Sequence, residues 1–472
     1  LYKMINRFIL NYLGIFFILL SILAFFNIIY SYYFNLYLNI DTYAVTLTIS
    51  LLFGLSFLIK KKDLNKITIF QKILTVILGY FILPIIIALP YTLSIYNISF
   101  IDCYFESISG FTSTGFTVFE NIKHLDPSLI LWRSTSQWIG GLYFLFSIIL
   151  LIDIFDDNLK KSLTNFLSFN TAETFKQSFK VLILYSILTL TIFIILKIID
   201  LRTFDSFNFA LTIISSGGFL PNNNLSTILN SEIKIIIFSF TMLISFFSVF
   251  LAYNIFFYKK ESLNVFSEDF YLLIYLAFLI IIFFIFFNFN NKFPEIFLGI
   301  TTSISNVGIY FDKSSSRLDV IFLILVIIGG SFFSTSSGLR FFKLFNLTKF
   351  SINELLSHTR PRQIFTNKIS FFERNINRSD ITKYFLAILL FILSLFVISS
   401  LLTLNNIDFI SSFKLGILTI MNTVNSGLYG VENFEFQKIN FFTKIIFILF
   451  MIIGRVELIS ILILLKKFLF KS

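Results

Sequence analysis

Residues 107–117 read SISGFTSTGFT and lie between long apolar segments of the chain. Two glycines and several hydroxyl residues are poor material for a helix that faces lipid, where each backbone polar group needs a partner within the protein. Such a stretch is tolerated at membrane depth only where protein buries it or where it lines a water-filled space. The stretch therefore raises the question of what the rest of the chain builds around it.

The composition is that of a membrane protein with many helices. Of the 472 residues, 57% are hydrophobic and only 13% are charged, whereas about a quarter of the residues of a soluble domain are charged. Apolar runs of membrane-spanning length recur along the chain and are far longer than barrel strands. The 68 phenylalanines accompany heavy use of Ile, Asn and Lys, which we attribute to A/T-rich codons. The predicted fold class is an all-α integral membrane protein.

Several kinds of site are excluded by the residues that are scarce. Cys103 is the only cysteine, so an intrachain disulfide is impossible, and His124 and His358 leave little for histidine catalysis or a metal cluster. No glycine-rich phosphate loop follows a strand. The net charge of +11 is typical of Lys and Arg in cytoplasmic loops. We therefore expect neither an enzyme nor a nucleic-acid partner.

Ten apolar segments are predicted to be full-length spans, and the eighth is interrupted by glycine and serine. The first is too long for the core of a signal peptide and is followed by many more spans, so we interpret it as a transmembrane helix. The expected spans cover residues 8–32, 43–59, 70–90, 129–152, 179–200, 231–257, 268–289, 319–348, 383–403 and 440–465.

Four further segments are too short to cross a membrane. At about 1.5 Å per residue, such a helix covers roughly half of a 30 Å hydrocarbon core. Each is followed by a polar loop and then by a full span. The short segments are residues 101–111, 205–215, 294–304 and 408–421, and the polar loops are 112–117 (TSTGFT), 215–219 (SSGGF), 305–309 (SNVGI) and 422–427 (NTVNSG).

The order span, half-helix, polar loop, span therefore occurs four times, and internal repeats of this kind decide a fold. We predict two N-terminal transmembrane helices (1–66), a first pore-loop repeat (67–157), a second (158–262), a third with an intramembrane gate loop (263–350), a basic cytoplasmic linker (351–380) and a fourth repeat (381–472), arranged around a central pore.

Charge along the chain predicts the orientation of these elements. Lys and Arg mark cytoplasmic loops, and the clusters at 60–62, 160–161, 259–260, 340–383 and 466–467 fall where this arrangement requires cytoplasm. Both termini are then cytoplasmic and the four polar loops lie on the other side. Scattered charges oppose the rule: Lys292, Lys313, Arg317, Lys438 and Lys444 come out external.

Four polar loops on one chain would form a four-sided ring. Backbone carbonyls in such a ring replace the water around a monovalent cation, and glycine supplies the unusual φ and ψ angles that aim successive carbonyls one way. Each half-helix adds the negative end of its dipole. The alternative is four ordinary turns rich in Gly and Ser, but four in register with the topology favour the ring.

Several motifs together resemble the Trk/Ktr/HKT superfamily of potassium transporters. FESISGFTSTGFTV followed by LWRSTSQWIGGL is similar to the first pore loop and inner helix, SSGGF and SNVG to the second and third loops, and GRVELISILILL to the last helix. The two extra N-terminal spans look like the Trk branch. The resemblance implies potassium uptake across a bacterial cytoplasmic (inner) membrane, by a homodimer in which each subunit holds its own pore.

The resemblance also implies a cytoplasmic nucleotide-binding regulatory subunit of the TrkA/KtrA type. The basic stretch 340–383 is a candidate for its docking, although a solvated loop that favours anionic membrane lipids explains the same charge. Potassium is the expected transported ion, and coupling to Na⁺ or H⁺, as in symport, is left open.

The family's filter has one key glycine in each loop, which the resemblance assigns to Gly115, Gly217 and Gly308. Asn425 stands where the fourth is expected. Asparagine tolerates a positive φ better than most residues, but its extra amide makes a less selective Na⁺/K⁺ pathway the alternative function. The expected filter residues are Ser113, Thr114, Gly115, Ser215, Ser216, Gly217, Asn306, Val307, Gly308, Thr423, Val424 and Asn425.

The same family interrupts the third inner helix with a loop that blocks the pore. The matching gate residues are Gly329, Gly330, Ser331, Ser334, Thr335, Ser336, Ser337 and Gly338. A simple kink is the alternative. Phe332 and Phe333 are bulkier than the family's small residues, which suggests closure by a hydrophobic plug.

Arg455 completes the expected gate because it lies in the middle of an apolar helix. A charge at the centre of a bilayer costs about 3 kcal/mol or more, so it normally faces a cavity or a partner. Glu457 points elsewhere on a helix and is not an obvious partner. The resemblance suggests that Arg455 stabilises the closed loop and repels cations. An anchor bonded to half-helix carbonyls is the alternative, and both roles are compatible.

Two charged residues lie within the predicted half-helices. Glu106 either attracts cations near the outer mouth or is bonded to backbone, and Lys414 is expected to point away from the pore.

Two other protein classes are alternatives to a pore-loop transporter. An integral-membrane enzyme, such as a lipid transferase, would need a cluster of His, Asp or Glu at one membrane face, and the sequence offers none. A rocking-bundle carrier would have two related halves instead of four quarters.

Overall fold

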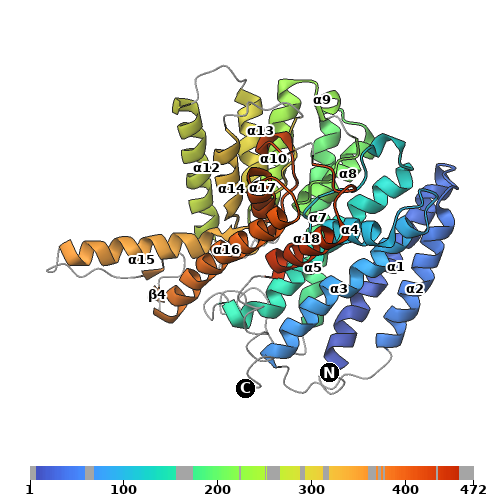
Figure 1. Cartoon of the computed structure of the whole chain (residues 1–472), viewed down its shortest axis with the longest axis horizontal. Coiled ribbons are helices and arrows are strands. Elements are labelled where there is room, and N and C mark those ends of the chain that lie inside the picture. Colours follow the sequence, from blue (N-terminus) through green and yellow to red (C-terminus); the bar gives the residue numbers. More distant parts are fainter. Residues whose placement is uncertain are drawn as a thin grey trace.

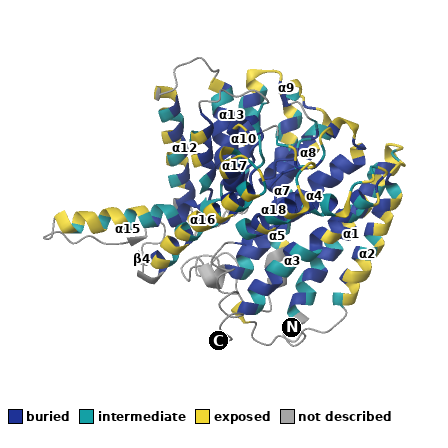
Figure 2. Ribbon diagram, viewed as in Figure 1, coloured by how far each residue is buried: buried dark blue, intermediate teal, exposed yellow. Residues whose placement is uncertain are grey.

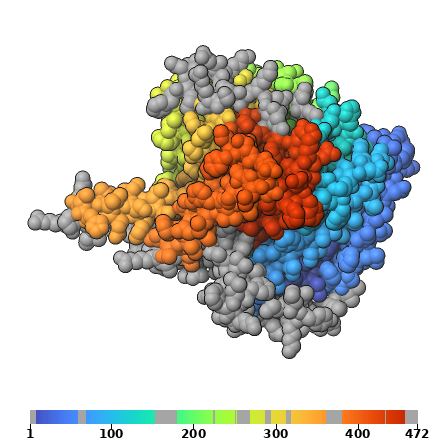
Figure 3. All heavy atoms as spheres, in the orientation of Figure 1, coloured from blue at the N-terminus to red at the C-terminus, as the bar shows by residue number. Residues whose placement is uncertain are grey.

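The computed structural model describes residues 7–58, 68–155, 174–222, 225–249, 251, 266–286, 293–311, 318–359, 368–369, 374–375, 378–431 and 434–456. Within these residues the chain is mostly helical, and the helices gather into one body from which α15 projects (Figure 1). The space-filling view shows α15 as an arm that stands out from the side of the body (Figure 3).

Among the described residues, seven helices are long and apolar enough to cross a membrane. They begin and end at Phe8–Tyr33, Ile40–Leu58, Ile69–Thr92, Pro127–Leu151, Phe179–Ile198, Glu268–Ile285 and Asp380–Leu404. Exposed apolar side chains such as Phe26, Phe284 and Phe396 cover the outer helices, while α5, α10 and α18 are largely buried (Figure 2). Large apolar surfaces of this kind suit contact with lipid. The protein is a multi-pass all-α membrane protein, so the predicted fold class is confirmed.

Two helices, α1 (Arg7–Tyr33) and α2 (Ile40–Leu58), precede the rest and pack on each other. The remaining elements follow in four groups, each with one helix of 12 residues. The first group is α3 (Ile69–Thr92), α4 (Phe100–Phe111), η1 (Ile122–His124) and α5 (Pro127–Phe155); the second is α7 (Thr174–Ile198), α8 (Thr203–Ile214), α9 (Leu225–Ile228) and α10 (Glu232–Phe246). The third is α12 (Phe266–Phe286), α13 (Phe293–Ile304), α14 (Asp319–Ile327), β1 (Ile328–Gly329), β2 (Leu339–Arg340) and α15 (Phe341–Thr359); the fourth is α16 (Arg378–Leu404), α17 (Phe409–Ile420), η3 (Gly427–Tyr429) and α18 (Phe441–Val456), preceded by β3 (Lys368–Ile369) and β4 (Arg374–Asn375).

Local signals explain where the 12-residue helices begin. The Ser99 side chain accepts a hydrogen bond from the Asp102 backbone N–H at the start of α4, and Asp408 accepts one from Ser411 at the start of α17. Such caps satisfy backbone donors that a helix leaves free at its first turn.

Two expected spans are broken in the structure. The span 231–257 is interrupted because α10 ends at Phe246, and the span 319–348 is divided by the parallel pair β1–β2, in which Gly329 is opposite Arg340. The expected interruption of the eighth span is therefore present. Helix α15 continues across the boundary predicted at 350/351.

Some sequence predictions fall outside the described residues. These are the two chain ends, with Glu457, and the lysine clusters at 60–62, 160–161, 259–260 and 466–467. The predicted orientation and the exact domain limits therefore stay predictions.

Candidate functional site: a ring of four polar loops

The four short helices end in the same backbone geometry. The second residue after each helix has a left-handed backbone, with φ of 58° at Ser113, 54° at Ser216, 58° at Asn306 and 47° at Asn422. Ser and Asn occupy this region only because the surrounding bonds hold them there. The next residue then donates its N–H to the carbonyl five residues back: Thr114 to Ser109 (2.9 Å), Gly217 to Thr212 (2.8 Å), Val307 to Thr302 (3.1 Å) and Thr423 to Leu418 (2.9 Å).

This shared turn makes the loops comparable residue by residue. The fourth residue after the helix is Gly115 in the first loop, Gly218 in the second, Gly308 in the third and Val424 in the fourth. We call these four residues the loop ring. Gly115 and Gly308 have φ of 83° and 74°, a region that residues with a Cβ rarely adopt.

The members of the loop ring meet at one place. A Cβ built on Gly115 would lie 3.0 Å from Val424 Cβ and 3.1 Å from the Gly218 backbone. One built on Gly308 would lie 2.7 Å from Val424 Cγ1 and 2.8 Å from the Val424 carbonyl oxygen. One built on Gly218 would overlap the Val424 side chain and lie 2.8 Å from the Val307 carbonyl oxygen. The four loops therefore converge with their backbones close together.

A vestibule of about 530 Å³ opens on one side of the loop ring. All four ring residues line it, together with aromatic and acidic side chains that include Phe119, Phe219, Tyr310, Glu120 and Glu435. Since every polar loop contributes to its lining, the vestibule is a space shared by the four groups of helices.

Gly217 and Asn425, which were expected at key filter positions, each lie one residue away from the loop ring in the sequence, and their role in a filter stays a prediction. Gly217 is the third residue after α8, and a Cβ built on it would overlap the Gln137 side chain instead of the other loops. Asn425 is the fifth after α17; it lacks a positive φ, and its Nδ2 donates to the Val431 carbonyl (3.2 Å). Asn425 nevertheless lines the same vestibule as Val424. The motif that assigned Gly217 and Asn425 does not show at which residue each short helix ends, and the count from the helix end defines the loop ring.

The residues that precede the loop ring in each loop do not line the vestibule and instead bond to one another and to neighbouring helices. Asn422 Nδ2 donates to Thr114 Oγ1 (3.0 Å) and to the Met451 carbonyl in α18 (2.9 Å). Asn306 Nδ2 donates to the Val326 carbonyl in α14 (2.9 Å) and to Thr423 Oγ1 (3.2 Å). These bonds tie the fourth loop to the first and third. In the second loop, the Ser215 hydroxyl bonds back to Leu211 (3.0 Å), while the Ser216 and Thr335 hydroxyls lie 3.3 Å apart.

Thr335 belongs to the small-residue loop, residues 329–338, which fills the break between α14 and α15. Its backbone caps the end of α10: Ser331 N–H donates to Phe246 O (3.0 Å) and Ser336 N–H to Ser245 O (3.3 Å). These carbonyls would otherwise lack partners at the helix end. Within the loop, Gly330 N–H donates to Ser336 Oγ (3.0 Å), Gly338 has φ of 82°, and Phe332 and Phe333 are buried.

Arg455 joins the small-residue loop to the first polar loop. Its Nη1 donates to Ser337 Oγ and its Nη2 to Ser113 Oγ (3.4 Å). The guanidinium carbon lies 3.8 Å from the centre of the Phe144 ring, a cation–π contact. The side chain is 2% exposed, and no acidic residue in the described part of the chain forms an ion pair with it. The sequence thus correctly expected these two elements to meet.

Arg340 holds the same loop, and the sequence reasoning missed it. Its Nη1 donates to the carbonyls of Ser336 (2.9 Å), Ser331 (3.0 Å) and Ser334 (3.4 Å), and its carbon lies 5.1 Å from the Phe144 ring centre. Its position directly after the Gly- and Ser-rich break was the available signal, but Arg340 was interpreted as the first residue of a cytoplasmic basic stretch.

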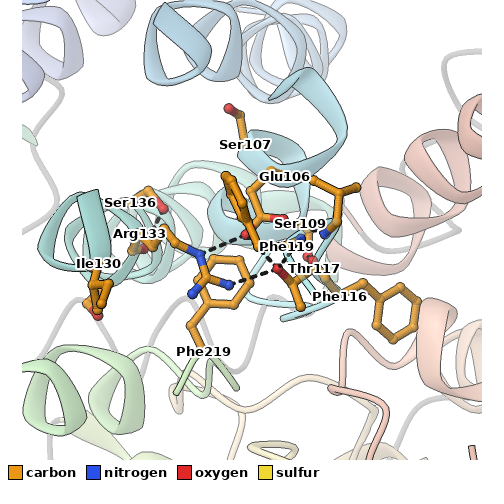
Figure 4. Close-up of polar contacts among 12 residues, drawn as sticks. Glu106, Ser107, Ser109, Phe116, Thr117, Phe119, Ile130, Arg133, Ser136 and Phe219 are labelled. Atoms are coloured by element: carbon orange, nitrogen blue, oxygen red, sulfur yellow. Dashed lines mark hydrogen bonds and ion pairs between the residues drawn. The ribbon is translucent and has the colours of Figure 1, made fainter. Parts of the chain in front are cut away.

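A buried ion pair supports the vestibule wall (Figure 4). Glu106 Oε1 lies 2.8 Å from Arg133 Nε, and the carboxylate also accepts hydrogen bonds from Thr117 Oγ1 (3.1 Å) and Val118 N–H (2.9 Å). Arg133 stacks over the Phe219 ring of the second loop at 4.1 Å. Glu106 is fully buried, so the bonded carboxylate is the alternative that the structure supports, and Arg133 is a residue that the sequence reasoning missed.

Lys414 is accounted for as well. Its Nζ lies 3.1 Å from Asp319 Oδ2, which joins α17 to the start of α14. Lys414 does not line the vestibule, and its orientation relative to a pore stays a prediction.

Several known transport proteins are similar to this chain in sequence. An uncharacterized cation transporter of Methanocaldococcus jannaschii is 26% identical over 464 residues, 93% of this chain and 91% of its own. The Trk system potassium uptake proteins TrkG and TrkH of Escherichia coli are each 25% identical, over 80% and 86% of this chain and the same shares of their own. No protein-family model matches the chain.

The crystal structure of the potassium transporter TrkH from Vibrio parahaemolyticus has the same fold. It superposes with a TM-score of 0.83 at 20% sequence identity, over 97% of this chain and 98% of that one. The resemblance found in the motifs is therefore confirmed: Trk potassium uptake proteins, which are transporters and not enzymes, are homologues of this chain, and the chain is a TrkH-like membrane subunit in its fold.

Proposed function

We propose that the protein takes up potassium across a membrane, along a path that runs between the four polar loops. One observation carries this proposal: the same position of all four loops lines the floor of one vestibule, while an earlier position of the first loop contacts the buried guanidinium of Arg455. An ion path needs this kind of common axis. The Trk potassium uptake proteins among the homologues support potassium as the ion.

The loop ring and the residues before it form the proposed filter. The Val307 and Val424 carbonyl oxygens lie at the point where the loops meet, and carbonyl oxygens at such a point replace the water of a potassium ion. The left-handed backbone at Gly115 and Gly308 aims the neighbouring carbonyls. In this assignment Gly218 and Val424 take the places that the motifs gave to Gly217 and Asn425.

The small-residue loop and Arg455 form the proposed gate. The loop lies against Ser216 and, through Arg455, against Ser113, so it closes the side of the filter away from the vestibule. A buried cation that has no acidic partner among the described residues raises the energy of an approaching potassium ion. At an effective dielectric constant of about 20 and a separation of about 6 Å, the repulsion is roughly 3 kcal/mol.

The finer assignments follow the family resemblance. The protein works as a homodimer with one path per subunit, in a bacterial cytoplasmic membrane, with both termini in the cytoplasm. A nucleotide-binding regulatory subunit acts on the gate, and the projecting helix α15, which is continuous with β2 and the small-residue loop, is the element that could transmit its movement.

Growth rescue tests the proposal. A bacterium that lacks its own potassium uptake systems should grow at low potassium when it makes this protein, and should not grow when it makes a Gly218→Ala variant present at the same level in the membrane. If the unmodified protein reaches the membrane and neither restores growth nor carries rubidium in proteoliposomes, potassium uptake is the wrong function.

A less selective Na⁺/K⁺ pathway is the second candidate. The observation in its favour is that the loop ring has three glycines and one valine, so the four sides do not offer the ion equivalent backbone. Parallel uptake of radioactive sodium and rubidium by proteoliposomes distinguishes the two functions, since a potassium transporter should prefer rubidium by a wide margin.

A further inference from the structure

The fourth member of the loop ring differs in kind from the other three. Val424 Cβ and Cγ1 approach the positions that a side chain on Gly115, Gly218 or Gly308 would occupy, at 3.0 Å for Gly115, 2.7 Å for Gly308 and overlapping for Gly218. The valine side chain therefore occupies the space next to the three ring glycines, which have no side chains of their own. It does so at the floor of the vestibule, where all four residues are in contact with the same space.

The fourth loop holds this valine firmly in place. Asn422 is bonded to Thr114 and Met451 on one side, and Thr423 Oγ1 accepts from Asn306 on the other. A valine is stiff about χ1 because two carbons branch from Cβ. The side chain can neither swing far by rotation nor move away with a loose loop.

The groups on both sides of Val424 are polar or charged, whereas its own side chain is apolar. Toward Arg455 the loops present the hydroxyls and amides of Ser113, Thr114 and Asn422, and the vestibule contains the carboxylates of Glu120 and Glu435. The Val307 and Val424 carbonyl oxygens at the ring can replace part of the water of a passing ion. On the side that the isopropyl group occupies, however, the ion loses water and gains no oxygen in return. Apolar constrictions obstruct ions for this reason.

We propose that the Val424 side chain is a hydrophobic restriction within the filter, and that its size sets the rate at which cations pass the loop ring. The inference rests on the proposed function, because it assumes that the path runs between the polar loops. It adds a residue-specific obstacle that is separate from the Arg455 gate.

The test is a size series at one position. Val424→Ile, the unmodified protein, Val424→Ala and Val424→Gly are reconstituted in proteoliposomes, and initial uptake of radioactive rubidium is measured per folded protein. The same series is made with Arg455→Ala, so that the gate does not mask a change at the ring. Uptake should rise with each reduction in size, by about tenfold from valine to glycine, which corresponds to roughly 1.4 kcal/mol of barrier.

A matched control separates size at the ring from general loosening of the vestibule. Val118 is also a buried valine and lines the same vestibule, but it lies outside the ring. Val118→Ala should change uptake less than twofold while Val424→Ala raises it. If Val424→Gly fails to fold, as judged by size-exclusion chromatography, the order of Ile, Val and Ala still decides the matter.

The outcomes distinguish this inference from the proposed function. If the Val424 variants take up rubidium equally in both backgrounds, while Arg455→Ala increases uptake, the path is right and the restriction at Val424 is wrong. If no variant, Arg455→Ala included, carries rubidium, the proposed function fails and the restriction fails with it.

Discussion

Along the proposed path, the loop ring contains the uncharged side chain of Val424, whereas the side away from the vestibule contains the guanidinium of Arg455 and the small-residue loop. The first proposed obstacle acts through the size of a side chain that offers no oxygen ligand and is stiff about χ1. The second acts through charge and a few hydrogen bonds that a movement of the loop would break. A regulator can therefore act on the second obstacle and hardly on the first.

The largest effect is expected at Arg455, the charged member of this comparison. Arg455→Ala removes the repulsion and the bond to Ser337, so basal rubidium flux should rise by up to about a hundredfold, the rate equivalent of roughly 3 kcal/mol. Arg455→Lys should restore the charge but only part of the closure, since it lacks the planar fork of donors. Flux in proteoliposomes measures both. Flux from a well-folded Arg455→Ala protein at or below the unmodified level would make Arg455 an anchor only.

The next effect tests which glycine of the second loop belongs to the ring. A Cβ at Gly218 would overlap Val424 Cβ, which cannot rotate away because it is bonded to the backbone. Gly218→Ala should therefore reduce rubidium uptake about tenfold or more, a barrier increase of roughly 1.4 kcal/mol. The three atoms nearest a Cβ at Gly217 all belong to the Gln137 side chain, which accepts one hydrogen bond, from Phe219 N–H (3.3 Å). A side chain held by that bond shifts more easily than backbone or a Cβ, so Gly217→Ala should act less. Equal losses for both variants would contradict the register described above.

A smaller effect is expected at Arg340, which holds the small-residue loop of the proposed gate. Arg340→Gln keeps a hydrogen-bond donor but loses most of the bonds to Ser331, Ser334 and Ser336. Basal flux should rise about threefold, the rate equivalent of roughly 0.7 kcal/mol, because glutamine keeps part of the bonding to the loop. Faster proteolysis within residues 329–338 should accompany it, and Lys343→Gln, in the adjoining helix α15, serves as the comparison variant.

The smallest effect on flux is expected at Glu106, whose ion pair with Arg133 supports the vestibule wall. Glu106 is neutralised by Arg133, so Glu106→Gln should change flux less than twofold in the protein that folds. It should nevertheless reduce stability by about 3–5 kcal/mol, because Arg133 keeps a buried charge without its partner. Thermal unfolding in detergent measures this. Glu435→Gln is the matched control, since its ion pair with Lys438 is exposed and such pairs contribute about 0–1 kcal/mol.

The sequence by itself determined the class of the protein and the parts of the site. Long apolar runs can only be helices in lipid, so the seven membrane-length helices among the described residues followed from composition. The four short segments were too short to span a membrane, and each forms a helix of 12 residues. Their polar loops, the Gly- and Ser-rich break and the unusual arginine in the last helix were equally plain, because each violates what a transmembrane helix requires. All of these signals are local.

The tertiary structure decided which residues meet. The residue that occupies each ring position depends on where the preceding helix ends, and a backbone hydrogen bond and contacts with the other loops fix that end. In the fourth loop, the end of α17 at Ile420 makes Val424, and not Asn425, the fourth residue after the helix. The roles of Arg133 and Arg340 depend on partners in other helices, and an arginine beside a loop looks the same in sequence whether it is solvated or buried. Helix type follows from periodicity and hydrophobicity along the chain, but partners and register follow from packing between segments far apart in sequence.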